Sequence, residues 1–278
     1  MAAARSSPSP SPWPWPWDRA LVTGASSGIG REIARQLAAG GSDLVVVARD
    51  RRRLDDLAAE LSGRHRDVAV EVLSADLADG DQLAAVAARI AEGGGERERL
   101  VDFVVNNAGF GTYGPLAGAD VDLEEREIAV NVLAVVRLTH AAVRAMVSRG
   151  RGAVLNVSSM AGLQATPGNA TYGATKAFVA SFGEAVAGEL AGTGVTITTV
   201  LPGFTRTEFH DRAGIAGRRV PGAAWQSAEA VAATALAATR AGRPWVVPGA
   251  LNKVAAAVAG PVPRGVRRWA AARVAGHL

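Results

Sequence analysis

The strongest constraint on the fold is a regular alternation of short β-branched apolar runs with longer stretches of helical periodicity, starting at Ala20. Alternation of this kind predicts βαβ units and therefore a parallel sheet. The runs are apolar throughout rather than alternately polar, as expected when helices cover both faces of the sheet. We therefore expect an α/β fold in which an open, doubly wound parallel sheet of about seven strands lies between two layers of helices.

The pattern also locates the individual elements. The predicted strands are Ala20–Thr23, Leu44–Ala48, Val68–Leu73, Val101–Val105, Ala153–Val157, Val195–Leu201 and Trp245–Val247. The predicted helices are Ile29–Ala39, Arg51–Leu61, Asp79–Ala91, Leu123–Ser148, Thr171–Ala191 and Ala228–Ala241. An open sheet of this type binds its ligand in a crevice at the carboxyl ends of the strands. The residues that follow the predicted strands are therefore the candidates for a binding site.

Composition excludes several classes of function. The chain has 278 residues, of which 49% are hydrophobic, enough for a large single core. It contains no cysteine, which excludes disulfides, thiolate catalysis and cysteine-based zinc sites. Its four histidines are widely separated, so we expect no metal site. The net charge of +4 comes mainly from arginines interleaved with acidic residues, and with 5% aromatics no nucleic-acid partner is expected.

Both ends of the chain differ from the alternating region. Residues 1–17 are rich in Pro and Ser with alternating Trp, which predicts a disordered arm; a docking role for the Trp-Pro run is the alternative. No apolar stretch follows Arg5 as a secretory signal requires, and no uninterrupted apolar run reaches the length of a membrane span. We therefore expect a cytoplasmic protein with one domain over residues 18–250.

The C-terminal extension, residues 251–278, is basic and amphipathic, and three uses remain open for it. It can pack across the substrate opening, join a contact between subunits, or make a weak contact with a membrane surface.

A glycine-rich turn follows the first predicted strand. Its sequence is TGASSGIG over residues 23–30, with the spacing G-x-x-x-G-x-G rather than G-x-G-x-x-G. Glycines let backbone N–H groups approach a phosphate, and the helix that follows directs its positive N-terminus at the same group. Together with the strand before it, the turn predicts a Rossmann-like dinucleotide site. Its candidate residues are Gly24, Ser26, Ser27, Gly28, Ile29 and Gly30.

The end of the second strand bears on the choice of dinucleotide. Arg49 comes directly after the strand and Asp50 follows it. At this place an acidic residue holds a ribose 2′-hydroxyl, whereas an arginine accepts a 2′-phosphate. We therefore predict NADP(H) as the preferred cofactor, with NAD(H) as the alternative. In the contrary interpretation Arg49 belongs to a solvated charged run, residues 49–53, and does not touch the cofactor.

Two further strand ends complete the expected cofactor groove. Asp76 and Leu77 follow the third strand, where a carboxylate and a backbone amide can meet an adenine edge. Asp76 can equally be the N-cap of the next helix, and this alternative stays open. The fourth strand ends in the Asn-Asn-Ala-Gly segment, of which Asn107, Ala108 and Gly109 are candidates for lining the groove; a simple turn is the alternative.

A tyrosine and a lysine provide candidate chemistry. Tyr172 and Lys176 stand four apart on a predicted helix and therefore share a face. A nearby ammonium favours the phenolate, so it can lower the tyrosine pKa from ~10 toward neutral. Ser159, thirteen residues before the tyrosine, can hold a substrate oxygen and stabilise charge on it. The adjacent Ser158 competes for this role.

These motifs together resemble the short-chain dehydrogenase/reductase family in its single-domain form. The matching segments are TGASSGIG (23–30), Asp76, NNAG (106–109), Asn131 in VNVL, Ser159 in NVSSMAG, YGATK (172–176) and PGFTRT (202–207). The resemblance covers about residues 18–250. It implies a catalytic tetrad of Asn131, Ser159, Tyr172 and Lys176. Asn131 then positions water in a proton relay; in a structural interpretation it bonds backbone and holds a local kink.

The resemblance also implies contacts of Pro202, Gly203 and Thr207 with the nicotinamide carboxamide, and a lid over residues 205–225. The expected lid carries an apolar underside of Phe209, Ile215, Val220 and Trp225. The apolar residues that can line the same pocket are Phe110, Tyr113, Leu163 and Phe204. The implied activity is hydride transfer between NADP(H) and a carbonyl or alcohol of a hydrophobic small molecule, with Tyr172 as general acid/base. A homodimer or homotetramer is also implied. The alternatives are a catalytically silent NAD(P)-binding regulator and an epimerase or dehydratase on the same scaffold.

Overall fold

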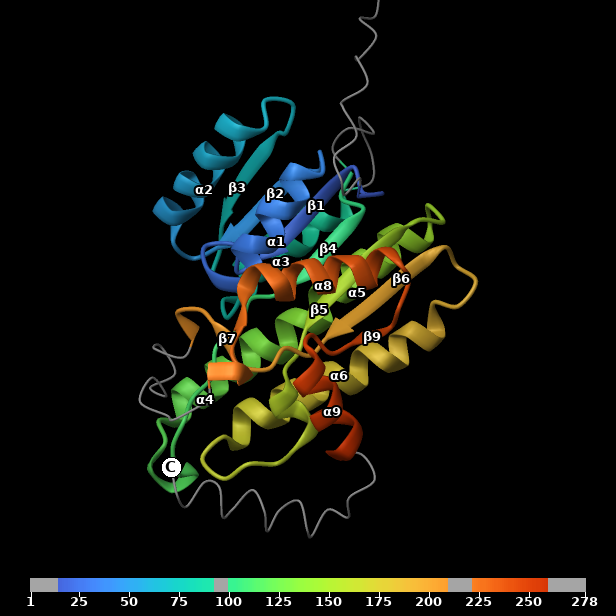
Figure 1. Cartoon of the computed structure of the whole chain (residues 1–278). Coiled ribbons are helices and arrows are strands. Elements are labelled where there is room, and N and C mark those ends of the chain that lie inside the picture. The colour runs from blue at the N-terminus through green and yellow to red at the C-terminus, as the bar shows by residue number, and fades with distance from the viewer. Residues whose placement is uncertain (1–14, 93–99, 210–221, 260–278) are drawn as a thin grey trace, which may run out of the picture.

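The structure, a computed structural model, describes residues 15–92, 100–209 and 222–259, and it confirms the α/β fold (Figure 1). Seven parallel strands form one sheet in the order β3-β2-β1-β4-β5-β6-β9. The strands are β1 (Arg19–Thr23), β2 (Asp43–Ala48), β3 (Val70–Ser74), β4 (Phe103–Asn106), β5 (Gly152–Val157), β6 (Val195–Val200) and β9 (Trp245–Val246). A short parallel pair, β7 (Thr205–Arg206) and β8 (Gln226–Ser227), lies apart from this sheet.

The helices alternate with the strands as predicted. They are α1 (Gly28–Ala39), α2 (Arg51–Arg64), α3 (Gly80–Ala91), α4 (Val121–Ile128), α5 (Ala134–Val147), α6 (Ala170–Glu189), α8 (Ala228–Arg240) and α9 (Ala250–Ala259). Within the described residues, three short 3-10 helices lie in the connections: η2 (Leu116–Gly118), η4 (Met160–Leu163) and η5 (Gly222–Ala224).

The strands β1 to β6 each contribute to two cores because successive side chains point to opposite faces of the sheet. Val22 packs with α1, α2 and α8 on one face, whereas Leu21 packs with α3, α5 and α6 on the other. Figure 1 shows α1 and α8 crossing the first of these faces. Burial on both sides explains why the strands are apolar throughout.

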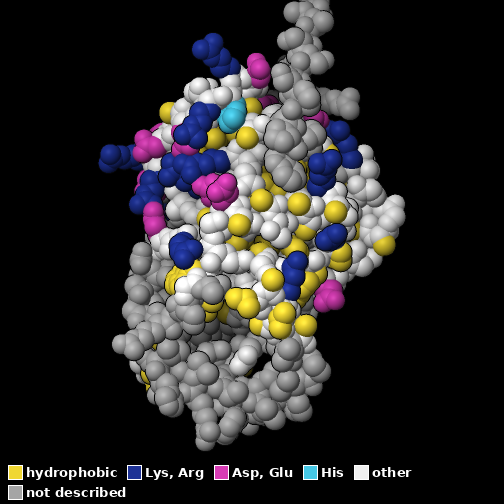
Figure 2. All heavy atoms as spheres, in the orientation of Figure 1, with side chains coloured by type: hydrophobic (Ala, Val, Ile, Leu, Met, Phe, Trp, Pro, Cys, Tyr) yellow, Lys and Arg dark blue, Asp and Glu magenta, His cyan; other side chains and the backbone are white. Residues whose placement is uncertain are grey.

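Charges of both signs share the surface around α2 (Figure 2). Glu60 of this helix pairs with Arg31 and Arg35 of α1, at 2.9 Å in each case. The described part of this face therefore has no uninterrupted basic stripe.

The predicted single helix Leu123–Ser148 is interrupted in the structure. A π-helical turn, η3 (Ala129–Leu133), separates α4 from α5 and contains Asn131. The stretch Val121–Val147 has the length of a membrane span and its most apolar window has a mean hydropathy of 1.4, but 39% of that window is buried inside the protein. It packs on the sheet as a core helix, so its length and hydropathy are no argument for a membrane.

The last residues of the expected N-terminal arm, Trp15 and Trp17, are packed against the sheet. Trp17 stacks on Phe103 of β4 with ring centroids 4.1 Å apart, and Trp15 stacks on Trp17. Both indoles are buried, and the Trp15 N–H donates a 2.8 Å hydrogen bond to the Gln36 carbonyl. Large aromatic rings bury more area than any other side chain, which outweighs the extended preference of the Trp-Pro run. The rest of the arm, residues 1–14, lies outside the described residues.

Candidate active site

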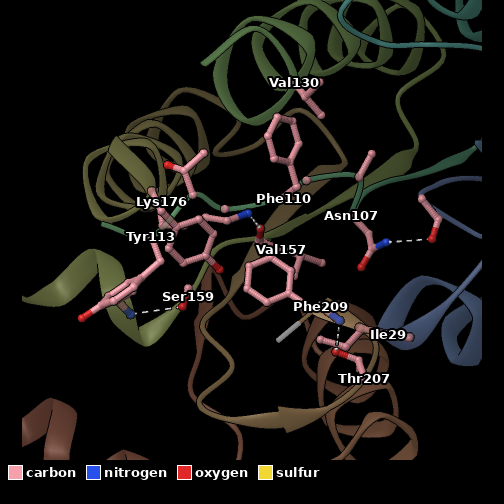
Figure 3. A pocket seen from close by; sticks show the side chains of 18 of the residues that line it. Ile29, Asn107, Phe110, Tyr113, Val130, Val157, Ser159, Lys176, Thr207 and Phe209 are labelled. Carbon is pink, nitrogen blue, oxygen red and sulfur yellow. Dashed lines mark hydrogen bonds between the residues drawn. The ribbon is translucent and has the colours of Figure 1, made fainter. Parts of the chain in front are cut away.

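A cleft of about 1270 Å³ opens at the carboxyl ends of the strands. The strand order reverses between β1 and β4, which is where an open α/β sheet forms its ligand crevice. The turn from β1 to α1 lines one end of the cleft, and the first turn of α6 lines the other. Figure 3 shows side chains from both ends, with Ile29 and Asn107 on one side and Ser159 and Lys176 on the other.

The glycine turn is shaped for close approach of backbone. Gly24 and Gly28 have φ angles of 65° and 55°, which side chains other than glycine rarely adopt. A Cβ on Gly30 would collide with the Asn107 amide and with the carbonyl of Gly24. The α1 helix begins at Gly28, so its free N–H groups face the cleft, a cradle that fits a pyrophosphate.

Asn107 ties the end of β4 to the glycine turn. Its amide donates to the Thr23 carbonyl at 2.9 Å and lines the cleft, as do Ala108 and Gly109. The Thr23 hydroxyl in turn accepts from the backbone N–H groups of Asn107 and Ala108, at 2.9 and 3.0 Å. The segment is therefore more than a simple turn, because it holds two walls of the cleft together.

Arginines lie where the 2′-position of an adenosine ribose is expected. Arg49 is exposed and lines the cleft. Asp50 accepts from the Arg53 N–H at 3.1 Å and caps α2, so its carboxylate has a structural role. Arg53 lines the same end and makes a 2.8 Å ion pair with Glu208, at the start of the expected lid.

Asp76 lines the cleft but is not a helix cap. The N-cap of α3 is Asp79, so the N-cap interpretation of Asp76 is wrong. Asp76 accepts from the Ala78 N–H at 3.0 Å, which closes a local turn, and pairs with Arg126 of α4. Leu77 beside it also lines the cleft, so the pair remains in place for an adenine edge.

Tyr172, Lys176 and Ser159 meet at the other end of the cleft. The Lys176 ammonium lies 5.7 Å from the centroid of the Tyr172 ring and donates to the Val157 carbonyl at 3.0 Å (Figure 3). Ser159 is hydrogen-bonded to Tyr172 and lines the cleft. The Ser158 hydroxyl instead donates to the Lys176 carbonyl at 2.7 Å in the protein interior, so only Ser159 faces the phenol.

Burial dominates the acid–base properties of this group. It raises the pKa of Tyr172 to about 12, with the hydrogen bond to Ser159 acting in the opposite direction. The same burial lowers the pKa of Lys176 to about 8. The protein groups alone therefore do not bring the phenol toward neutral, contrary to the simple expectation for a tyrosine beside an ammonium. At neutral pH Tyr172 is a protonated phenol, a proton donor.

Asn131 is fully buried in the π-helical turn and holds the cleft wall from behind. Its amide donates to the Phe110 carbonyl at 2.9 Å and to the Thr175 hydroxyl at 3.1 Å, and its oxygen accepts from the Phe110 N–H at 3.2 Å. The two bonds to the Phe110 backbone are those expected if Asn131 has a structural role. The asparagine does not itself line the cleft.

The segment after β6 closes the site from one side. Pro202, Gly203 and Thr207 line the cleft, and the Pro202 carbonyl accepts from the Met160 N–H at 2.9 Å. The Phe209 ring packs on Tyr172 with centroids 5.4 Å apart. Residues 210–221 of the expected lid lie outside the described residues.

Several apolar residues surround the same end of the cleft. Phe110, Tyr113, Phe204 and Phe209 line it, but Leu163 does not. Asn252 of α9 also lines the cleft, so the first turn of the C-terminal extension packs at the opening. The other end of the extension, residues 260–278, lies outside the described residues.

A family model described as short chain dehydrogenase matches residues 18–215. The chain belongs to the short-chain dehydrogenase/reductase family. It is 39% identical over 195 residues to sulfoacetaldehyde reductase 2 of Chromohalobacter salexigens, covering 69% of this chain and 74% of that protein. As a member of this family it is an oxidoreductase that uses a nicotinamide cofactor and acts on alcohol or carbonyl groups.

Solved structures of short-chain dehydrogenases agree with this assignment. A short-chain dehydrogenase from Sphingobium yanoikuyae in complex with NADPH superposes with a TM-score of 0.77 at 35% identity, covering 88% of this chain and 96% of that one. The bulky-bulky ketone specific alcohol dehydrogenase from Comamonas testosteroni gives 0.74 at 29% identity, covering 89% and 95%.

Sequence reasoning missed three residues that shape this short-chain dehydrogenase/reductase site: Arg53, Arg126 and Glu127. Arg53 and Arg126 are ordinary surface arginines in a helical pattern. Glu127 did leave a signal, because it is an acidic residue four positions before Asn131 and so shares its face of a helix.

Proposed function

We propose that this protein is an NADPH-dependent reductase of a carbonyl group on a hydrophobic small molecule, with Asn131, Ser159, Tyr172 and Lys176 as its catalytic set. The observation that carries the proposal is the convergence of a protonated phenol, a serine hydroxyl and a buried ammonium at one end of a glycine-lined cleft. The tight space around Gly24 and Gly30, which a Cβ would fill, fits a dinucleotide pyrophosphate.

The bound nicotinamide would supply the hydride, and the protein would supply orientation and protons. Ser159 would donate a hydrogen bond to the substrate oxygen and stabilise the negative charge that develops there. Tyr172 would give its proton to the same oxygen. The high pKa of Tyr172 supports this direction, since a phenol with a pKa of about 12 is protonated throughout the physiological range.

Lys176 would act in two ways in this scheme. Its positive charge favours the phenolate that remains after proton donation. Its ammonium, which donates to the Val157 carbonyl at 3.0 Å, would also donate hydrogen bonds to the nicotinamide ribose. Asn131 would fix the position of Phe110 and hold a water that returns a proton through Lys176.

The preference for NADP(H) rests on the arginines at the far end of the cleft. Arg49 is exposed at the rim, whereas Asp50 is engaged as a helix cap. A 2′-phosphate would meet the Arg49 guanidinium there. The Sphingobium yanoikuyae relative, which was solved with NADPH, supports the same choice.

A hydrophobic substrate is favoured by the side chains around Tyr172. Phe110, Tyr113, Phe204 and Phe209 provide aromatic surface on several sides of the opening. The name of the Comamonas testosteroni relative, specific for ketones with two bulky groups, supports a carbonyl compound with large apolar substituents.

A homo-oligomer is also part of the proposal. Phe178 of α6 is 41% exposed and stacks on Phe182, with ring centroids 5.7 Å apart. Leu133, at the end of η3, is 59% exposed. Apolar surface on these helices is suited to contact with a second subunit. Light scattering at micromolar concentration would measure the mass, and a monomer would contradict this part.

A carbonyl panel monitored by NADPH absorbance tests the reductase activity, with Tyr172→Phe as the decisive variant. Turnover should fall by about 10²–10⁴, whereas NADPH binding measured by fluorescence should persist. A wild-type protein that binds NADPH but reduces none of the ketones and aldehydes would favour the silent regulator instead.

A further inference from the structure

Glu127 is a carboxylate enclosed by the protein, behind the wall of the cleft. Its side chain is 0% exposed. One carboxylate oxygen, Oε2, accepts from the Thr112 N–H at 2.8 Å and from the Thr112 hydroxyl at 2.9 Å. The other, Oε1, is buried with no hydrogen-bond partner among the described residues. A buried charge is costly unless it is compensated, so its presence needs an explanation.

The position of Glu127 connects it to the proposed catalytic set. It lies one helical turn before Asn131, so the two side chains share a face of the helix. Asn131 bonds the backbone of Phe110, and Glu127 bonds Thr112, two residues further on. Together they hold the segment 110–112, which lines the cleft, against the end of α4.

Lys176 approaches the same wall from α6. A Cβ placed on Gly109 would lie 2.8 Å from the Asn131 oxygen and 3.4 Å from the Lys176 ammonium nitrogen. The ammonium and the Asn131 amide therefore reach the same glycine from two helices. Glu127 is the acidic group one turn behind this meeting point.

The charge of Glu127 acts on both ionisable groups of the proposed catalytic set, Lys176 and Tyr172. It raises the pKa of Lys176, against the burial that lowers this pKa to about 8. It also raises the pKa of Tyr172. The elements η3, η4 and β5 contain no titratable residue, and α6 carries Tyr172, Glu184 and Glu189 besides Lys176 itself. Burial raises the pKa of Glu127 itself, the hydrogen bonds from Thr112 lower it, and the nearby charge of Glu124 on α4 raises it.

We propose that Glu127 is a positioning residue of this active site, which anchors the 110–112 segment through Thr112 and serves as the buried counter-charge of Lys176. The inference rests on the proposed function. Its physical content is that Lys176 has to remain an ammonium in a dry environment, and a carboxylate shielded from water is an effective way to keep it charged.

Glu127→Gln tests the charge, because glutamine keeps an oxygen that can accept from Thr112. The ratio of wild-type to variant kcat/KM for carbonyl reduction should be near one at pH 6 and should approach tenfold at pH 9. This follows if the alkaline limb of the profile moves down by about one pH unit when the counter-charge is lost. A variant that is folded by circular dichroism and has the wild-type profile would overturn the proposal.

Two further variants separate the anchor from the charge. Thr112→Val removes the hydroxyl donor, so it should raise KM without moving the pH profile. Glu127→Asp keeps the charge on a shorter side chain and should restore most of the alkaline limb lost in Glu127→Gln. A uniform loss at all pH values in Glu127→Gln, with no rescue by Glu127→Asp, would show a structural role only and would refute the counter-charge.

The failure of this inference can be told apart from failure of the proposed function. If Tyr172→Phe abolishes turnover and Glu127→Gln behaves like the wild type, only the role of Glu127 falls. If the wild type itself reduces no carbonyl compound, the proposed function falls, and NMR titration of the Lys176 ammonium in wild type and Glu127→Gln still measures the charge effect. Equal pKa values for Lys176 in the two proteins would reject it.

Discussion

The Lys176 ammonium lies 5.7 Å from the centroid of the Tyr172 ring, and both residues line the same cleft. Burial favours the neutral form of each group. It raises the pKa of the Tyr172 phenol and lowers the pKa of the Lys176 ammonium. The pair is therefore suited to proton donation by the phenol, provided that the ammonium keeps its charge.

The two adjacent serines should differ sharply in function. Ser159→Ala removes the hydroxyl that faces Tyr172, so kcat/KM should fall by about 10²-fold or more. Ser158→Ala removes a buried hydrogen bond to the Lys176 carbonyl, so it should cost about 1 kcal/mol of stability with a much smaller loss of activity. Steady-state kinetics and urea unfolding measure the two effects; equal kinetic losses would contradict the assignment.

Cofactor preference should depend on Arg49. Arg49→Ala should weaken NADPH binding by about 10-fold or more, because a charge-assisted contact to the 2′-phosphate is lost, and should leave NADH binding nearly unchanged. Arg52→Ala is the matched control, since Arg52 is an exposed arginine of the same run that does not line the cleft. Fluorescence titration with both cofactors gives the comparison. An equal effect of Arg49→Ala on the two cofactors would mean that Arg49 is a solvated surface residue and does not bind the 2′-phosphate.

Stability should rise with pH because of Lys176. The pKa of its ammonium in the folded protein is about 8, below the ordinary value of 10.5. The unfolded chain therefore binds more protons between pH 8 and pH 10, and the cost of burying the charge is removed as pH rises through this window. The cost is fully present below pH 8. Relative to Lys176→Met, the wild type should gain on the order of 1–3 kcal/mol between pH 8 and pH 10. Urea unfolding at both pH values measures it; a constant difference would refute the shift.

A methyl group on the glycine turn should be poorly tolerated. A Cβ on Gly30 meets the Asn107 amide and the Gly24 carbonyl, so Gly30→Ala should cost about 1–3 kcal/mol of stability and weaken cofactor binding. Gly63→Ala near the end of α2 is the control, because nothing lies within 4 Å of its added Cβ. That variant should be neutral or stabilising by up to about 1 kcal/mol. Thermal melts with and without NADPH distinguish the two outcomes.

The tryptophans before β1 should contribute to stability. Trp17 is 7% exposed and stacks on Phe103, so Trp17→Ala should cost about 3–5 kcal/mol. Leu116→Ala, at a side chain that is 66% exposed, should cost less than about 0.5 kcal/mol. If both variants unfold at the wild-type urea concentration, the packing of the tryptophans contributes nothing.

Periodicity predicted the main features of the fold because each strand is buried on both sides and each helix on one. The predicted strands agree with the observed ones within two residues at each end, as Val68–Leu73 against Val70–Ser74 illustrates. The glycine turn and the Tyr-Lys pair were also predictable, since each depends on residues close in sequence.

Features that depend on distant partners were not predictable in this way. Trp17 is held by Phe103, 86 positions later, and nothing in a Trp-Pro run indicates that partner. The N-cap of α3 is Asp79 rather than Asp76 because backbone geometry decides which of two similar carboxylates reaches the first N–H groups. The raised pKa of Tyr172 comes from burial by the surrounding protein, which sequence spacing alone does not indicate.

The wider turn at Ala129–Leu133 lets the two halves of one long helix follow different rotational phases. The α5 half can keep its apolar stripe against the sheet, while Glu127 of α4 and Asn131 of the turn itself reach the 110–112 segment that lines the cleft. Deleting one residue there would restore the ordinary pitch and rotate Glu127 by roughly 100° relative to α5. The extra residue in this turn sets the rotation of α4 relative to α5. Residues of α4 that act at the cleft can therefore change without changing how α5 packs on the sheet.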